Sequence, residues 1–299
     1  MNTTHGTTDG TTDGTLTYVY AAAPHTQRLR DAVAGLRGIY GSPVMLLMAP
    51  PSTRRPLLAF ASSHVPRRDF NEDALKNHFE DLEWLESVAR AHHDVVQALS
   101  LRTAVLPLRM ATVYQDDDRA GQALAEQHNA FAQRLAELTD HTEFGVKVYL
   151  TPTRSGTETT ETTGTASGPP AATTPGKAYL QRRKAQHSAQ EAVYSQAQRA
   201  AAAIEAIAAR YASRHARHPT QSGALTGPAE NVLNDAYLVP DTYAEQFRAA
   251  IVEAADAFDS VRVEVTGPWA PYSFAMAPPE RPETTATATS TSTGQGHPS

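Results

Sequence analysis

The side chains that most readily suggest chemistry are three consecutive polar residues in the stretch ARAHHDVV: His92, His93 and Asp94. Imidazole and carboxylate groups are both common ligands of transition metals. Adjacent residues of a helix point about 100° apart, so His92 and His93 cannot hold one ion without ligands from elsewhere. His92 also falls on the apolar face of its helix, where a buried, hydrogen-bonded histidine is the commoner outcome. We therefore predict no metal site here.

Arg109, in the stretch LPLRM, is the second candidate. Proline inside a strand, here Pro107, is typical of a sheet edge or a bulge. If the apolar residues of LPLRM face one way, Arg109 faces the other. Its guanidinium then either lies over the sheet or pairs with a carboxylate such as Glu143. The alternative is that Arg109 marks an interaction surface on an exposed edge.

The sequence contains none of the common catalytic motifs: no G-x-x-x-x-G-K-[ST], no G-x-G-x-x-G after a strand, no G-x-S-x-G and no H-E-x-x-H. It also has no cysteine, which excludes disulfides, thiolate ligands and a cysteine nucleophile. We expect no catalytic, cofactor-binding or metal-binding residues, and no enzyme. The alternative is a small-molecule enzyme on a ferredoxin-like α+β scaffold, which would need a pocket with a convergent His or carboxylate at His92 or Arg109.

The charge balance argues against nucleic acid as a partner. The chain has 26 Lys and Arg against 32 Asp and Glu, a net charge of -6, whereas proteins that bind phosphates by counterion release are basic. The strand-like stretch EFGVKVYL also lacks the order of basic, glycine and aromatic residues that stacks RNA bases. The first residues do not resemble a signal peptide, and no apolar run could span a bilayer. We expect a soluble, cytoplasmic protein without membrane contact.

Three segments rich in Thr, Gly, Pro or Ser are too polar to build a core: a tail at 1–14, a linker at 151–176 and a tail at about 278–299. The linker divides the rest into an N-terminal domain at 15–150 and a C-terminal domain at 177–277. We expect each to be a small α+β domain with a mainly antiparallel sheet.

In the first domain, alternation or short apolar runs predict strands at 15–22, 43–49, 57–65, 103–114 and 143–150. One apolar stripe at helical spacing predicts a helix over about 71–100, and a second helix is expected over about 117–138. In the second domain we predict a long Ala-rich helix over 177–215, a strand over 231–239, and a helix to about 258 that Asp241 could cap. The clean alternation of Val261, Val263 and Val265 predicts a final strand.

The final strand leads into GPWAPYSF, where we expect Gly267 and Pro268 to end the pairing. The aromatic residues Trp269, Tyr272 and Phe274 follow with no charge between them. Each aromatic side chain can bury roughly 150–250 Å². Folding back over the core is therefore the favoured interpretation, and a patch for docking a partner is the alternative.

Seven stretches occur in an order that resembles the GvpL/GvpF family of gas vesicle proteins: TYVYAA, FEDLEWLESVARAHHDVVQAL, AVLPLRMATVY, EFGVKVYL, GKAYLQRRK, NDAYLVP and VEVTGPWAPYSF. The resemblance spans about Leu16 to Phe274. The chain departs from the family pattern at Met110 and Ala111, where a Phe-Gly pair is common, at Ala270, where a second proline is common, and in its long insert at 151–176.

The resemblance implies two α+β domains, each a modified ferredoxin-like arrangement, in a minor component or assembly factor of gas vesicles. It implies no catalytic residues. The expected partners are the hydrophobic major shell protein and other minor vesicle proteins, since apolar shell subunits would aggregate unless they are held before polymerisation. A free sheet edge or an apolar groove could hold them. Arg109, Trp269, Tyr272 and Phe274 are the candidate partner-binding residues, and a single-stranded RNA binder of related topology is the remaining, disfavoured alternative.

Overall fold

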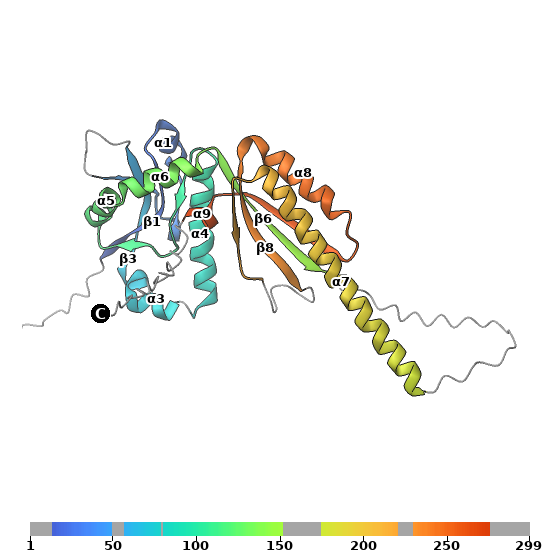
Figure 1. Ribbon diagram of the computed structural model, residues 1–299. Coiled ribbons are helices and arrows are strands. Elements are labelled where there is room, and N and C mark those ends of the chain that lie inside the picture. Colours follow the sequence, from blue (N-terminus) through green and yellow to red (C-terminus); the bar gives the residue numbers. More distant parts are fainter. Residues whose placement is uncertain (1–13, 50–56, 79, 152–174, 221–229, 276–299) are drawn as a thin grey trace, which may run out of the picture.

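The structure is a computed structural model that describes residues 14–49, 57–78, 80–151, 175–220 and 230–275. The expected tails at 1–14 and 278–299 lie outside these residues except for Gly14, and the expected linker lies outside them except for its two ends. The described residues form two antiparallel sheets with helices packed on them (Figure 1). The prediction of an α+β protein is confirmed.

The first sheet has the strand order β2-β3-β1-β4, and β5 also pairs with β1. Its strands are β1 (Thr15–Pro24), β2 (Met45–Met48), β3 (Leu58–Pro66), β4 (Leu106–Pro107) and β5 (Val113–Tyr114). Alternation along β1 gives each face its own core. Tyr18 and Tyr20 pack under α1 (Gln27–Val33) and α4 (Leu82–Ser100), whereas Val19 and Ala22 pack under α5 (Asp117–Glu126) and α6 (His128–Leu138).

The second sheet has the order β7-β8-β6-β9. Its strands are β6 (His141–Leu150), β7 (Arg214–Arg217), β8 (Asn231–Pro240) and β9 (Val261–Trp269). One face is covered by the helices α7 (Pro175–Tyr211) and α8 (Ala244–Ala255), with Phe144, Ile204 and Phe247 in the core between them. The first turns of α7 project beyond the sheet (Figure 1).

A third core joins the two parts of the molecule. Ala236 and Leu238 of β8 pack with Leu135 and Leu138 of α6, and Phe274 from the end of the described chain completes the cluster. All of these side chains are at most 3% exposed. Side chains from both sheets therefore share this third core.

The assignment of residues 143–150 to the first sheet is wrong. β6 pairs with β8 along one edge and with β9 along the other, so it is an inner strand of the second sheet. The alternation of Phe144, Val146 and Val148 identifies a strand but not its partners, which follow it in the sequence. The expected boundary at residue 150 therefore does not separate the two sheets.

The two helices expected in the first domain are each interrupted. Asp81 starts α4 by accepting hydrogen bonds from the amides of Glu83 and Trp84, so the stripe over 71–100 is divided between α3 (Glu72–His78) and α4. A break at Gln127 separates α5 from α6. The two remaining short helices of this part are η1 (Ile39–Gly41) and α2 (Arg67–Phe70).

Other differences are local. α1 was not predicted, although Thr26 caps it by accepting from the Leu29 amide. In place of the single strand expected over 103–114, the chain forms the two short strands β4 and β5. Between them it turns through Ala111, whose φ is +63°. α7 ends at Tyr211, where the expected helix ran to 215, because the chain enters β7. Asp241 opens the short helix η2 (Asp241–Tyr243), and no side-chain hydrogen bond caps the start of α8.

Candidate functional site

Residues 266–275, here called the crossing segment, leave the second sheet at the end of β9 and return to the first part of the molecule. The segment passes α4 and ends in the short helix α9 (Tyr272–Ala275), which contacts β4. Because it carries all three aromatic candidates, it is the centre of the candidate site.

Gly267 gives the crossing segment its path. Its φ is +118°, a conformation that side chains disfavour, and a Cβ at this position would lie 2.7 Å from the carbonyl oxygen of Glu143. The register between β6 and β9 shifts opposite this glycine, and pairing resumes between Glu143 and Trp269. The expectation that Gly267 and Pro268 end the strand is therefore wrong, since they form an irregularity within it.

Gln97 of α4 fixes the crossing segment to the helix. Its side-chain amide donates to the carbonyl oxygen of Pro268 at 3.2 Å, and its side-chain oxygen accepts from the amide of Ala270 at 3.2 Å. Both polar ends of one side chain are thus used by backbone groups on either side of Trp269. Sequence reasoning missed Gln97, because nothing in the pattern of α4 distinguishes it from a solvated polar residue.

Trp269 and Tyr272 meet at His93. The ring of His93 lies 5.5 Å from that of Trp269 and 6.0 Å from that of Tyr272, centroid to centroid. Tyr272 is half-buried against the first core, and burial raises the pKa of its hydroxyl. Trp269 remains 39% exposed although the neighbouring Ala270 is buried. It is therefore the aromatic candidate that presents a surface.

Phe274 has a different position, in the core shared by the two parts of the molecule. It is 1% exposed, and the guanidinium of Arg214 lies 5.3 Å from its ring centroid. Next to it, Ser273 bonds to Glu143 of β6: the carboxylate accepts from the Ser273 amide at 2.9 Å and from its hydroxyl at 2.7 Å. Burial raises the pKa of Glu143, and the bonds from Ser273 partly offset this.

Arg109 stands apart from the crossing segment. It is exposed on the turn between β4 and β5, where its carbonyl oxygen accepts from both the amide and the hydroxyl of Thr112. In the described part of the chain, no hydrogen bond or ion pair of its guanidinium is found. Glu143, which we considered as its partner, is bonded to Ser273 instead.

His92 is a core residue. It is 3% exposed, its Nδ1 lies 2.9 Å from the hydroxyl of Tyr18, and burial lowers its pKa to about 4. The Tyr18 hydroxyl also accepts from the Ala111 amide, so this pair supports the turn that carries Arg109. Among the described residues, no group of three or more His, Cys, Asp or Glu side chains could hold a metal ion.

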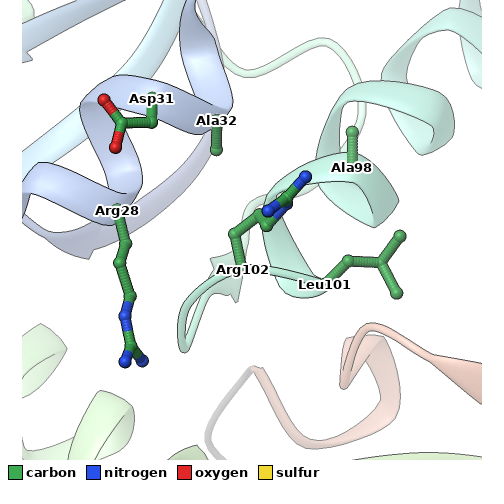
Figure 2. A pocket seen from close by; sticks show the side chains of 6 residues that line it. All are labelled: Arg28, Asp31, Ala32, Ala98, Leu101 and Arg102. Carbon is green, nitrogen blue, oxygen red and sulfur yellow. The ribbon is translucent and has the colours of Figure 1, made fainter.

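Trp269 lines one of two neighbouring hollows, and Leu101 lines both of them. The smaller, about 80 Å³, lies between the end of α4 and the crossing segment and is lined by Trp269, Pro268 and His141 among others. The larger, about 600 Å³, lies between α1 and the end of α4 (Figure 2). It is lined by Arg28, Asp31, Ala32, Ala98, Leu101 and Arg102.

Apolar and charged side chains are exposed together at these two hollows. The exposed apolar side chains are Leu101, at 70%, and Trp269, and the exposed charges at the larger hollow are those of Arg28, Arg102 and Asp31. Sequence reasoning identified Trp269 but not the others, because α1 was not predicted and Leu101 and Arg102 lie just past the end of a helix. No helix in the described ranges is long and apolar enough to cross a membrane.

Comparisons with known proteins give consistent matches. Residues 16–276 match the family described as gas vesicle synthesis protein GvpL/GvpF. The sequence is 37% identical over 263 residues to gas vesicle protein L of Streptomyces sp. (strain CB03234), an alignment that covers 87% of this chain and 92% of the relative.

The fold is similar to two crystal structures of the gas vesicle protein GvpF. The one from Anabaena sp. PCC7120 has a TM-score of 0.56 at 15% identity, covering 89% of this chain and 98% of that one. The one from Microcystis aeruginosa has a TM-score of 0.55 at 16% identity, covering 88% and 99%. At such identities the likeness concerns the fold.

Proposed function

This chain belongs to the GvpL/GvpF family of gas vesicle synthesis proteins, and we propose that it acts in vesicle formation as a non-enzymatic binding and assembly protein. Its partners are the hydrophobic major shell protein and other minor vesicle proteins. It holds apolar shell subunits in a state from which they can be added to a growing vesicle.

The observation that carries the proposal is the exposure of Trp269. The residues around it are fixed: Gln97 bonds the backbone on both sides, Ala270 is buried, and Gly267 sets the path of the chain. A large aromatic side chain held half-exposed on a rigid backbone loses little conformational freedom when a partner covers it. Tryptophan is also enriched among the residues that dominate protein–protein binding energy.

The chemistry of the site supports a binding role. His92 is buried and hydrogen-bonded to Tyr18, and Arg109 is exposed on a turn, so these two residues do not share a concave pocket. An exposed apolar surface suits a partner that is itself largely apolar.

The test is co-purification of the tagged full chain with the major shell protein from cells that form vesicles. We expect the wild type to retain shell protein and Trp269→Ala to retain at least fivefold less. Arg109→Ala tests the turn between β4 and β5 in the same way. Tyr243→Ala is the matched control, because Tyr243 is a 50% exposed aromatic residue on the second part of the molecule.

If the wild type retains neither shell protein nor any other vesicle protein, the proposed function is wrong. If Trp269→Ala and Tyr243→Ala retain equal amounts, the function stands but Trp269 does not carry it.

A further inference from the structure

We propose that the surface formed by Arg28, Arg102, Leu101 and Trp269, here called the arginine–tryptophan surface, binds an acidic segment of another vesicle protein. The segment presents carboxylate side chains to the two arginines and an apolar side chain to Leu101 and Trp269. The proposal rests on the proposed function and deepens it, since it states the chemistry of the partner at this site.

The first argument is that neither guanidinium group is paired within the described residues, although the exposed carboxylate of Asp31 lines the same hollow. Arg28 and Arg102 line one hollow of about 600 Å³, from α1 on one side and from just past α4 on the other (Figure 2). Within the described ranges neither side chain takes part in an ion pair or a hydrogen bond. Asp31, the acidic residue in the lining, accepts from the side-chain amide of Gln27 at 2.6 Å.

The second argument is that local structure does not account for Arg28. It is the second residue of α1, in the helix's first turn, where the helix dipole disfavours a cation. Arg102 follows the C-terminal end of α4, where the dipole favours a cation, so its position alone would need no ligand.

The third argument is the apolar part of the surface. Leu101 is 70% exposed and lines both hollows, so it connects the arginines to Trp269. A free phosphate would use the arginines and leave Leu101 and Trp269 uncovered. A peptide segment with acidic and apolar side chains covers all four residues, and Arg in particular binds carboxylates in a bidentate geometry.

The charge of the chain bears on the partner's identity. A net charge of -6 disfavours a polyanion such as nucleic acid, whose phosphates extend well beyond one local pair of arginines. A short acidic segment needs only that pair. A second copy of this acidic chain is the competing occupant, and its binding would appear as self-association.

The experiment uses the full chain and two synthetic 14-residue peptides with leucines at identical positions, one carrying glutamates and the other glutamines in their place. Isothermal titration at low salt should show the glutamate peptide binding at least tenfold more tightly than the glutamine peptide. Added salt should weaken the glutamate peptide's binding, because its carboxylates meet exposed guanidinium groups.

Three variants test the residues. Arg28→Glu with Arg102→Glu should abolish the preference for glutamate, and Trp269→Ala should weaken both peptides. The milder Arg28→Gln with Arg102→Gln guards against a folding defect. Arg248→Glu is the matched control, since Arg248 is an exposed arginine on α8, and it should leave binding unchanged within twofold.

Equal binding of the two peptides, or an unchanged preference in the double arginine variants, would overturn the proposal. The proposal would also be overturned if inorganic phosphate competed fully with the peptide and Trp269→Ala left that binding unchanged. It would likewise be overturned if the wild type self-associated and Arg28→Glu with Arg102→Glu abolished the self-association. If that double variant retains every vesicle partner at the wild-type level, this inference is wrong but the proposed function stands. If the wild type prefers the glutamate peptide but retains no vesicle protein, the proposed function is wrong while the preference for an acidic peptide stands.

Discussion

The carboxylate of Glu143 accepts two hydrogen bonds from Ser273, a residue 130 positions later in the chain. Glu143 belongs to β6, an inner strand of the second sheet, and Ser273 belongs to the short helix that packs on the first part of the molecule. The pair lies where the two parts meet, with Glu143 buried and Ser273 half-buried, so we expect the protonation state of Glu143 to affect how firmly the two parts are joined.

Glu143 should make stability depend on pH. Burial raises its pKa above the ordinary value of 4.5 in the folded state, so the folded protein binds more protons than the unfolded chain as the pH rises past 4.5. The free energy of unfolding therefore falls through this window. We expect the difference in unfolding free energy between the wild type and Glu143→Gln to decrease with pH above about 4.5 and then level off. Urea denaturation from pH 4 to 8 measures it, and a constant difference contradicts the prediction.

His92 should have the opposite effect. Its pKa is about 4 in the folded state and 6.5 ordinarily, so the unfolded chain binds more protons between these values and stability is lost as the pH falls from 6.5 to 4. A shift of this size corresponds to about 3 kcal/mol at most. His92→Gln should flatten the loss in urea titrations at several pH values, whereas the exposed His187→Gln should not.

Gly267→Ala should destabilise the protein by more than Gly35→Ala. Both glycines have positive φ, but a Cβ at Gly35 meets nothing within 4 Å whereas a Cβ at Gly267 lies 2.7 Å from the carbonyl oxygen of Glu143. The backbone strain, about 1–3 kcal/mol, is common to both, and the steric clash is specific to Gly267. Thermal unfolding of the two variants compares them, and equal losses would show that the crossing segment adapts.

Phe274→Ala and Trp269→Ala should separate folding from binding. Phe274 is 1% exposed in the core that joins the two sheets, so truncation should cost about 3–5 kcal/mol of stability. Because Trp269 is 39% exposed, its truncation to alanine should cost less than half as much stability. Urea denaturation gives both values. A similar loss for the two would mean that Trp269 is chiefly a packing residue.

Much of the fold follows from local periodicity. The strands β1, β2, β3 and β8 lie where alternation or a short apolar run predicted them, and α4 lies on the helical stripe, because these patterns reflect which side chains are buried. Periodicity does not report partners, however. β6 has the pattern of any half-buried strand, and only its pairing with β8 and β9 assigns it to the second sheet.

The candidate site was predictable only in part. The run of aromatics identified the crossing segment, but its continuation in the sheet depends on the register shift opposite Gly267. Gln97 and Glu143 act through bonds to Ala270 and Ser273, and contacts at such sequence separation leave no local signal.

The position of β6 determines how the molecule could be divided. The chain passes from β6 to α7 through residues 152–174, yet β6 and α7 lie in the same half of the molecule. A single cleavage introduced between Thr151 and Pro175 would therefore leave two polypeptides held together by the hydrogen bonds on both edges of β6. The two pieces should co-migrate under native conditions and separate only in denaturant, like a protein reconstituted from complementary fragments.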